Sequence, residues 1–181
     1  MPPHLPEANP PSANAFRATP TVTSAQFRAT LSRMPSAVSI IATRGPAGIG
    51  GLTCSAVCAV SDEPPTVLAC VHNRSAANAI IRANGVLCVN CLSSEQQELS
   101  QAFAGIGRLS IEQRFACAEW GTLVTGAPYC KGSLLALDCE VIDTRDVGTH
   151  SIFIGRVVAT AEATGEPLVY QRRAYATTRP L

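Results

Sequence analysis

The last third of the chain holds three strand-like stretches in succession, with only turn-forming residues between them. They are SLLALDCEVIDTRD, HSIFIGRVVATAEA and PLVYQRRAY, at residues 133–146, 150–163 and 167–175. All three are rich in β-branched and other apolar residues, which favours strands. No helix separates them, so the chain lacks a regular alternation of strand and helix. This order favours a barrel of strands with a few added helices.

The first part of the chain supplies the remaining strands and the expected helices. The strands are predicted at residues 37–45, 51–61, 65–71 and 86–92, and GPAGIGG predicts a hairpin turn between the first two. Helices are predicted at 24–34, with Ser24 as N-cap and Pro35 as the stop, at 73–85, ended by Gly85, and at 93–105, with a short helix or turn at 111–115. We expect a mainly β protein with one domain over residues 25–181, after a disordered Pro-rich tail over residues 1–24.

The charge and hydropathy of the chain exclude several classes of partner. A formal net charge of +1 gives no sign of a nucleic-acid or membrane-surface partner. The longest apolar runs, such as GVLCVNCL, are too short to cross a bilayer, and no basic segment followed by an apolar run marks a secretory signal. We therefore expect a cytoplasmic protein.

The eight cysteines suggest a disulfide framework or a metal site at first sight. Most lie in apolar strand-like runs, where a reduced thiol behaves as a small hydrophobe. Cys88 and Cys91 form a C-x-x-C, but within a strand this spacing places the two side chains on opposite faces, and no second C-x-x-C follows. We expect buried free thiols and no metal; a zinc or thiol-redox protein is the alternative that rests on the cysteines alone.

The stretch GLTCSAVCAVS is extended but built from small side chains. Small residues let a flat ligand approach the backbone of a strand closely. HNRSAAN, shortly downstream, joins a strand to a helix N-terminus, where free N–H groups together with Asn73, Arg74 and Ser75 form an anion site. A planar-ring site beside a phosphate site suits a nucleotide with an aromatic ring system. A tightly packed strand followed by an ordinary capped helix explains the same residues, and they favour neither interpretation.

Other catalytic motifs are weak or absent in this sequence. GPAGIGG does not fit G-x-G-x-x-G and leads into a strand, and no Ser-His-Asp or Cys-His signature stands out. The three histidines include His72 and His150 at strand ends, where a structural role is the common one.

Several separated blocks together resemble a known family. They are GLTCSAVCAVSDEPPTVLACVHNRSAAN, GVLCVNCL, FAGIG with EQRF, GTHSIFIGRV and PLVYQRRAY, and in order and spacing they resemble the short-chain flavin reductases from about Phe27 to the C-terminus. Within that family the chain is similar to the reductase components of two-component aromatic monooxygenases, such as those of 4-hydroxyphenylacetate 3-monooxygenase and chlorophenol 4-monooxygenase. The resemblance implies a split β-barrel of the flavin-reductase-like, FMN-binding type, a homodimer, and FAD or FMN with NADH as cofactors.

The resemblance also implies which residues bind the two nucleotides. Flavin contacts would come from the strand, its end, the helix start and a covering segment: Thr53, Cys54, Ser55, Ala56 and Val57, then Ser61 and Asp62, then Asn73, Arg74, Ser75 and Asn78, then Phe103, Arg114 and Phe115. The nicotinamide nucleotide would face His150, Tyr170, Arg172 and Arg173. Many relatives carry T-A-N-S where this chain has Thr53 to Ala56, so contacts there are expected mainly through the backbone.

The implied activity is transfer of hydride from NADH to flavin, followed by diffusion of the reduced flavin to a separate monooxygenase that hydroxylates a phenolic or chlorophenolic ring. His150 is the candidate catalytic residue, with a positioning role preferred; the alternative is a histidine bonded to a carbonyl at the start of a strand. One of Arg172 and Arg173 is expected to meet a pyrophosphate, the alternative being a solvated basic edge. Competing functions are a flavin-binding protein without reductase activity and a pyridoxamine phosphate oxidase on a related barrel.

Overall fold

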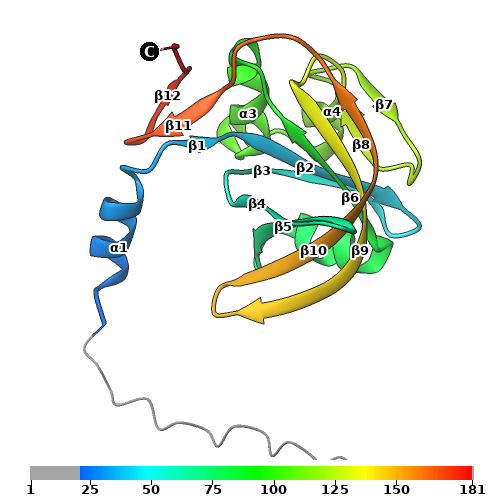
Figure 1. Ribbon diagram of the computed structural model, residues 1–181, viewed down its shortest axis with the longest axis horizontal. Helices are drawn as coiled ribbons and strands as arrows, with labels where there is room; N and C mark the ends of the chain where they lie inside the picture. Colours follow the sequence, from blue (N-terminus) through cyan, green and yellow to red (C-terminus); the bar gives the residue numbers. More distant parts are fainter. Residues whose placement is uncertain (1–20, 181) are drawn as a thin grey trace, which may run out of the picture. The chain divides into compact units, whose positions relative to one another are not determined.

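The computed structural model describes residues 21–180 (Figure 1). Helix α1, Ser24–Leu31, belongs to a small N-terminal unit that ends at Leu31. Thr23 caps it: its Oγ1 accepts from Gln26 N at 3.2 Å, while Gln26 Oε1 accepts from Thr23 N at 2.9 Å. Ser24 is therefore the first helical residue and not the N-cap, and the helix ends before Met34. Residues 1–20 of the predicted tail lie outside the described residues.

The main unit is built on a seven-stranded antiparallel sheet in the order β3-β2-β6-β9-β10-β5-β4. The strands are β2 Ser39–Gly45, β3 Gly48–Cys54, β4 Val57–Asp62, β5 Pro65–His72, β6 Val86–Cys91, β9 Leu135–Val147 and β10 His150–Glu162. β3 and β4 follow one another in the chain but lie at opposite edges of the order, so the sheet curls until its two edges come near each other. This is the mainly β, split-barrel fold predicted from the sequence.

The link between the two edges is the segment Ser55–Ala56, which interrupts the predicted strand 51–61. Cys70 N donates to Ala56 O at 2.9 Å, and Cys54 Sγ donates to Cys70 O at 3.5 Å. The chain thus leaves β3 and crosses to β5 before β4 begins. The prediction of one continuous strand is wrong here, because two residues of ordinary backbone carry the chain from one edge to the other.

Two smaller sheets complete the strands. β1 Ser36–Ala37 pairs with β11 Val169–Gln171, which pairs with β12 Ala174–Ala176, and β7 Trp120–Thr122 pairs with β8 Pro128–Cys130. The predicted strand 167–175 is therefore a hairpin. Its turn is formed by Arg172 and Arg173, both with positive φ, 50° and 66°. β7 and β8 were not predicted.

The helices of the main unit match the sequence pattern. α2 Ala76–Asn84 ends at Gly85, whose φ of 68° is the left-handed conformation that glycine adopts without strain. The predicted helix 93–105 consists of η1 Ser94–Gln96 and α3 Gln97–Phe103, and η2 Ile106–Arg108 leads to α4 Ile111–Phe115. Among residues 21–180, no helix is long and apolar enough to cross a bilayer.

Two of the three buried clusters of the described core lie on opposite faces of β2. Ile41 belongs to the cluster inside the barrel with Val71, Ile81 and Phe153, while its neighbour Ile40 belongs to a second cluster. Successive residues of a strand point to opposite faces, so both faces of β2 are covered. The second cluster includes Leu92, Leu99, Phe103 and Phe115. β3, at the sheet edge beside this cluster, has one long side without a partner strand.

Candidate functional site

The unpaired edge of β3 borders a cavity of about 560 Å³. This volume lies in the range of small-molecule sites. Gly50 and Gly51 lie at its wall, and a Cβ on Gly51 would lie only 2.7 Å from Phe103 Cε1. Glycine therefore lets the Phe103 ring approach the strand directly. The unpaired N–H and C=O groups of an edge strand are then available to a ligand in this cavity.

A helix N-terminus and an arginine also line this cavity. Ser75 is the N-cap of α2, which begins with Ala76 and Ala77, and the Ser75 hydroxyl makes no capping hydrogen bond. Arg114 lines the same cavity, is half-buried, and donates through Nε to Leu109 O at 3.1 Å. Free helix N–H groups and a guanidinium in one cavity form a favourable environment for a phosphate.

A second cavity of about 530 Å³ adjoins the first, because Thr53 and Ala104 line both. Its other wall is the β11–β12 hairpin, which supplies Tyr170, Arg173 and Tyr175. Tyr175 Oη lies 2.9 Å from Ser100 Oγ, and Thr53 Oγ1 donates to Ser100 O at 2.6 Å. These bonds fix the hairpin and β3 to the same helix, α3. Two neighbouring cavities with a shared wall can hold two planar ligands in contact.

The predicted site residues separate into two groups. Those that line one of the two cavities are Thr53, Ser55, Ser75, Phe103, Arg114, Tyr170 and Arg173. Those that line neither are Cys54, Ala56, Val57, Ser61, Asp62, Asn73, Arg74, Asn78, Phe115, His150 and Arg172.

Three side chains of the second group are committed to the interior. Cys54 packs in the barrel core, where burial raises the pKa of its thiol to about 11. Phe115 packs edge-to-face on Phe103, with ring centroids 5.1 Å apart. Asn78 is buried, and its amide donates to Val71 O and Ser151 Oγ at 3.2 and 2.9 Å. Their polar atoms or rings have partners within the fold, and a contact of these side chains with flavin stays a prediction.

The other members of the second group lie at turns or exposed edges. Ser61 Oγ donates to Glu63 O at 3.0 Å in the β4–β5 turn, beside the exposed Asp62. Ala56 and Val57 lie at the crossing between the sheet edges, where a backbone contact stays a prediction. Arg74 is exposed, and its N–H donates to His72 Nδ1 at 3.0 Å.

His150 begins β10 and is exposed. It is paired with His72 across the sheet, and the two rings pack edge-to-face with centroids 5.0 Å apart. Thr149 Oγ1 lies 2.9 Å from His150 Nδ1, so one ring nitrogen has a local partner. A role for His150 toward a nucleotide stays a prediction.

The cysteines behave mainly as core residues. All eight are free; Cys54, Cys88, Cys130 and Cys139 are buried, and Cys70 and Cys91 are half-buried. Burial raises the pKa of the Cys139 thiol to about 12 and also raises that of Cys88. Within residues 21–180, no group of three or more metal-binding side chains comes together.

Sequence reasoning missed several residues that line the cavities. They are Ile49, Gly50, Gly51, Leu52, Ala76, Ala77, Ile80, Ala104, Gly105 and Ile111 in the first, and Val38, Ser100, Gln101, Ile106 and Tyr175 in the second. The signal for Gly50 and Gly51 was present in GPAGIGG, which was interpreted only as a turn. Tyr175 and Gly105 belong to the quoted blocks PLVYQRRAY and FAGIG but received no role.

Known proteins share both the sequence and the fold of this chain. The family model described as flavin reductase like domain matches residues 31–179. The chain is 42% identical over 172 residues to FMN reductase (NADH) RutF from Ancylobacter novellus, a match that spans 94% of this chain and 92% of that relative. It superposes on a Haemophilus somnus protein described provisionally as a flavin reductase with a TM-score of 0.83 at 40% identity, over 87% of this chain and 100% of the other. Nitrilotriacetate monooxygenase component B from Mycobacterium thermoresistibile gives a TM-score of 0.78 at 32% identity, over 86% and 87% of the two chains.

Proposed function

This chain belongs to the flavin reductase-like domain family, and on that premise we propose that it oxidises NADH with flavin and releases the reduced flavin to a separate oxygenase. The observation that carries the proposal is the pair of adjoining cavities with a shared wall at Thr53 and Ala104. One has an open strand edge, a helix N-terminus and Arg114, which fit a flavin with its phosphate. The other has two tyrosines and Arg173, which fit a nicotinamide nucleotide.

The residues of the chain would bind and orient the two substrates. Hydride transfer from nicotinamide C4 to flavin N5 is chemistry that the two nucleotides supply when bound. Backbone N–H groups at the free edge of β3 would stabilise negative charge on the flavin ring system. Phe103 and Tyr170 would shape the space in which the rings meet, and Arg173 would meet a pyrophosphate. No nucleophile or strong general base is required.

The first experiment is the rate of NADH oxidation by the purified chain, followed at 340 nm without flavin, with FMN and with FAD. We expect a rate that requires added flavin and saturates with it, because the flavin acts as a substrate. Flavin binding without NADH oxidation would favour a flavin-binding protein. Failure to bind or turn over with either flavin would refute the proposal.

The preferred flavin is decided by the same assay. The sequence resemblance favours FAD, whereas relatives at about 42% identity are named FMN reductases (NADH). The first cavity offers one anion site, at the α2 N-terminus and Arg114, and FMN carries one phosphate. We therefore propose that FMN has the lower KM and that FAD is also accepted. A lower KM for FAD would reverse this preference.

We also propose that the protein is a homodimer. A groove runs beside the edge strand β4 and is lined by Val57, Cys58, Ala59 and Leu137, with the exposed Met34 at its rim. An exposed edge strand with small apolar residues is a surface that soluble proteins normally cover. Ser55 lines both this groove and the second cavity, so a second copy bound here would adjoin the site.

The dimer predicts a specific mutational result. Ala59→Glu places a charge in the groove, so we expect the protein to shift from dimer to monomer in light scattering coupled to gel filtration. Glu63→Gln, in the neighbouring turn, is the matched control and should remain dimeric. A monomeric wild-type chain would contradict the proposal.

The partner oxygenase is the second component of the proposed system. The resemblance points to a phenolic or chlorophenolic substrate, whereas one solved relative is component B of a monooxygenase for nitrilotriacetate, which has no aromatic ring. The aromatic substrate therefore stays a prediction. The expected compartment is the cytoplasm, where thiols stay reduced.

A further inference from the structure

A buried hydroxyl lies at the centre of a polar cluster outside both cavities. Ser151, on β10, is fully buried. Its Oγ accepts from Asn78 Nδ2 at 2.9 Å and from an Arg82 terminal nitrogen at 2.7 Å. It also lies within hydrogen-bond distance of Asn73 Oδ1 at 2.8 Å and Asp146 Oδ1 at 2.7 Å. The single hydroxyl proton goes to one of these two oxygens at a time, so the hydroxyl is fully satisfied.

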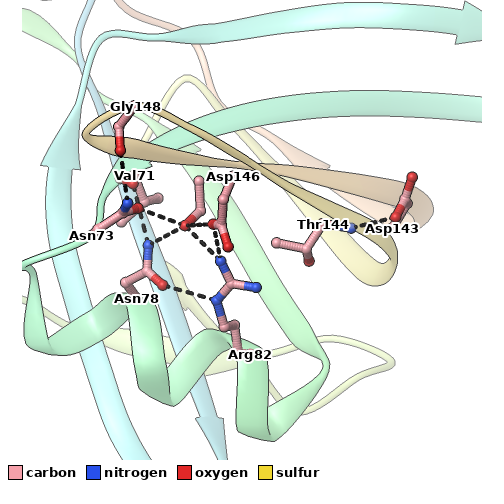
Figure 2. Close-up of polar contacts among 9 residues, drawn as sticks. Val71, Asn73, Asn78, Arg82, Asp143, Thr144, Asp146 and Gly148 are labelled. Atoms are coloured by element: carbon pink, nitrogen blue, oxygen red, sulfur yellow. Dashed lines mark hydrogen bonds and ion pairs between the residues drawn. The ribbon is translucent and has the colours of Figure 1, made fainter.

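Arg82 joins the elements of this cluster (Figure 2). Its Nε donates to Asn78 Oδ1 at 3.2 Å, one turn earlier on α2, and a terminal nitrogen forms an ion pair with Asp146 on β9. The guanidinium also lies 5.5 Å from the centre of the Phe153 ring. One side chain therefore contacts α2, β9 and β10, a geometry that the fork of arginine allows and a lysine cannot reproduce.

The cluster reaches the flavin cavity through Asn73. Figure 2 shows the Asn73 amide directed at Gly148, to whose carbonyl it donates at 3.3 Å. The Asn73 backbone N–H donates to Thr149 O at 2.9 Å. The tip of the β9–β10 hairpin thus holds Asn73 by its backbone and by both ends of its side chain. Ser75, two residues on, is the N-cap of α2 and lines the cavity.

We propose that Ser151, Arg82 and Asp146 are positioning residues of the flavin site, which clamp the turn 73–75 to the hairpin tip and so place the N-terminus of α2. This inference rests on the proposed function. It assigns a role to a network that lines neither cavity, and it accounts for the buried position of Asn78 beside Ser151.

The charges and burial in the network fit a positioning role. The Ser151 hydrogen bond, together with the Arg82 charge, lowers the pKa of Asp146, so its carboxyl is ionised near neutral pH. The ion pair itself is largely exposed, and such pairs contribute little to stability. The main effect of the pair is therefore to fix the geometry of the Ser151 hydroxyl, which lies between α2, β9 and β10.

The test compares Arg82→Met and Ser151→Ala with a control ion pair on the same hairpin. Arg156 donates to Glu140 at 2.5 Å across β10 and β9, far along the strands from the tip, so Arg156→Met removes a similar pair without touching the clamp. Flavin Kd is measured by quenching of flavin fluorescence, which needs no NADH. We expect Kd to rise about tenfold in both clamp variants and less than about twofold in Arg156→Met.

Two further measurements separate positioning from general stability. Amide hydrogen exchange at residues 73–75 should become faster in the clamp variants and stay unchanged in the control. Arg82→Lys, which keeps the charge but not the fork, should fall between wild type and Arg82→Met in Kd. Should Arg82→Met fail to fold, Ser151→Ala and Arg82→Lys carry the same comparison.

The outcomes distinguish this inference from the proposed function. A wild-type chain that binds neither FMN nor FAD overturns both. A wild type that binds flavin, with clamp variants whose Kd stays within twofold of the Arg156→Met value, overturns the clamp alone.

Discussion

Replacing Arg114 with alanine is expected to weaken flavin binding about thirtyfold, because a charge-assisted hydrogen bond to a phosphate is worth about 2 kcal/mol. Arg114 lines the first cavity together with residues of β3 and the N-terminal residues of α2. Its Nε donates to Leu109 O at 3.1 Å, which restrains the guanidinium. We expect its terminal nitrogens to meet an anion bound at the start of α2.

The kinetic signature of this change is specific. A contact with the non-reacting phosphate is made equally in the bound state and the transition state, so KM for flavin should rise while kcat at saturating flavin stays within about twofold. Flavin titration of NADH oxidation separates the two constants. Arg44→Ala, at an exposed arginine of β2 outside the cavity, is the control. A flavin KM within threefold of wild type would place the phosphate elsewhere.

The late strands could be predicted from the sequence because their signals are local. β9 and β10 fall within one or two residues of the predicted ranges, since long β-branched runs end at clear turn residues. The prediction of a single strand at 167–175 was wrong for a physical reason. The turn of this hairpin is formed by Arg172 and Arg173 at positive φ, a conformation that usually indicates glycine or asparagine in a sequence. Backbone in this conformation persists where its surroundings require it, and here it directs Arg173 to the second cavity.

The site could be predicted only as a region. A helix start within HNRSAAN was predicted, because strand, polar turn and apolar helix follow in order, but the predicted range began at residue 73 and α2 begins at Ala76. The face of α2 that carries Asn78 could not be assigned, since its partner Ser151 lies 73 residues away in the chain. The glycines of β3 were missed for a similar reason. Position 51 needs glycine because the Phe103 ring lies against it, and Phe103 belongs to a separate predicted helix.

The second large effect is expected at Asp138, whose buried side chain attaches a loop to the main sheet. Asp138 lies in the middle of β9 and is fully buried. Its Oδ2 accepts from Val124 N at 2.8 Å and Thr125 N at 2.7 Å, and its Oδ1 accepts from Thr125 Oγ1. Thr125 Oγ1 in turn accepts from Ala127 N at 3.1 Å. The loop between β7 and β8 is therefore attached to the main sheet through this side chain.

Asp138→Ala is expected to reduce the free energy of unfolding by about 3 kcal/mol, because three donors lose their acceptor inside the fold. For a chain of this size that corresponds to a fall in Tm of about 10 °C, measured by thermal melting. Asp143→Ala on the same strand removes a carboxylate whose ion-pair partner is the exposed Arg145, and its Tm should change by less than about 2 °C.

Asp138→Ala should change stability without changing flavin binding, and Arg114→Ala should change flavin binding without changing stability. The loop held by Asp138 lines neither cavity, so at a temperature where Asp138→Ala is folded its flavin KM should match wild type. Arg114→Ala should show the reverse, a raised KM with a Tm close to wild type. A raised flavin KM in folded Asp138→Ala would mean that the β7–β8 loop contributes to the flavin site. The assignment of Asp138 to stability alone would then be wrong.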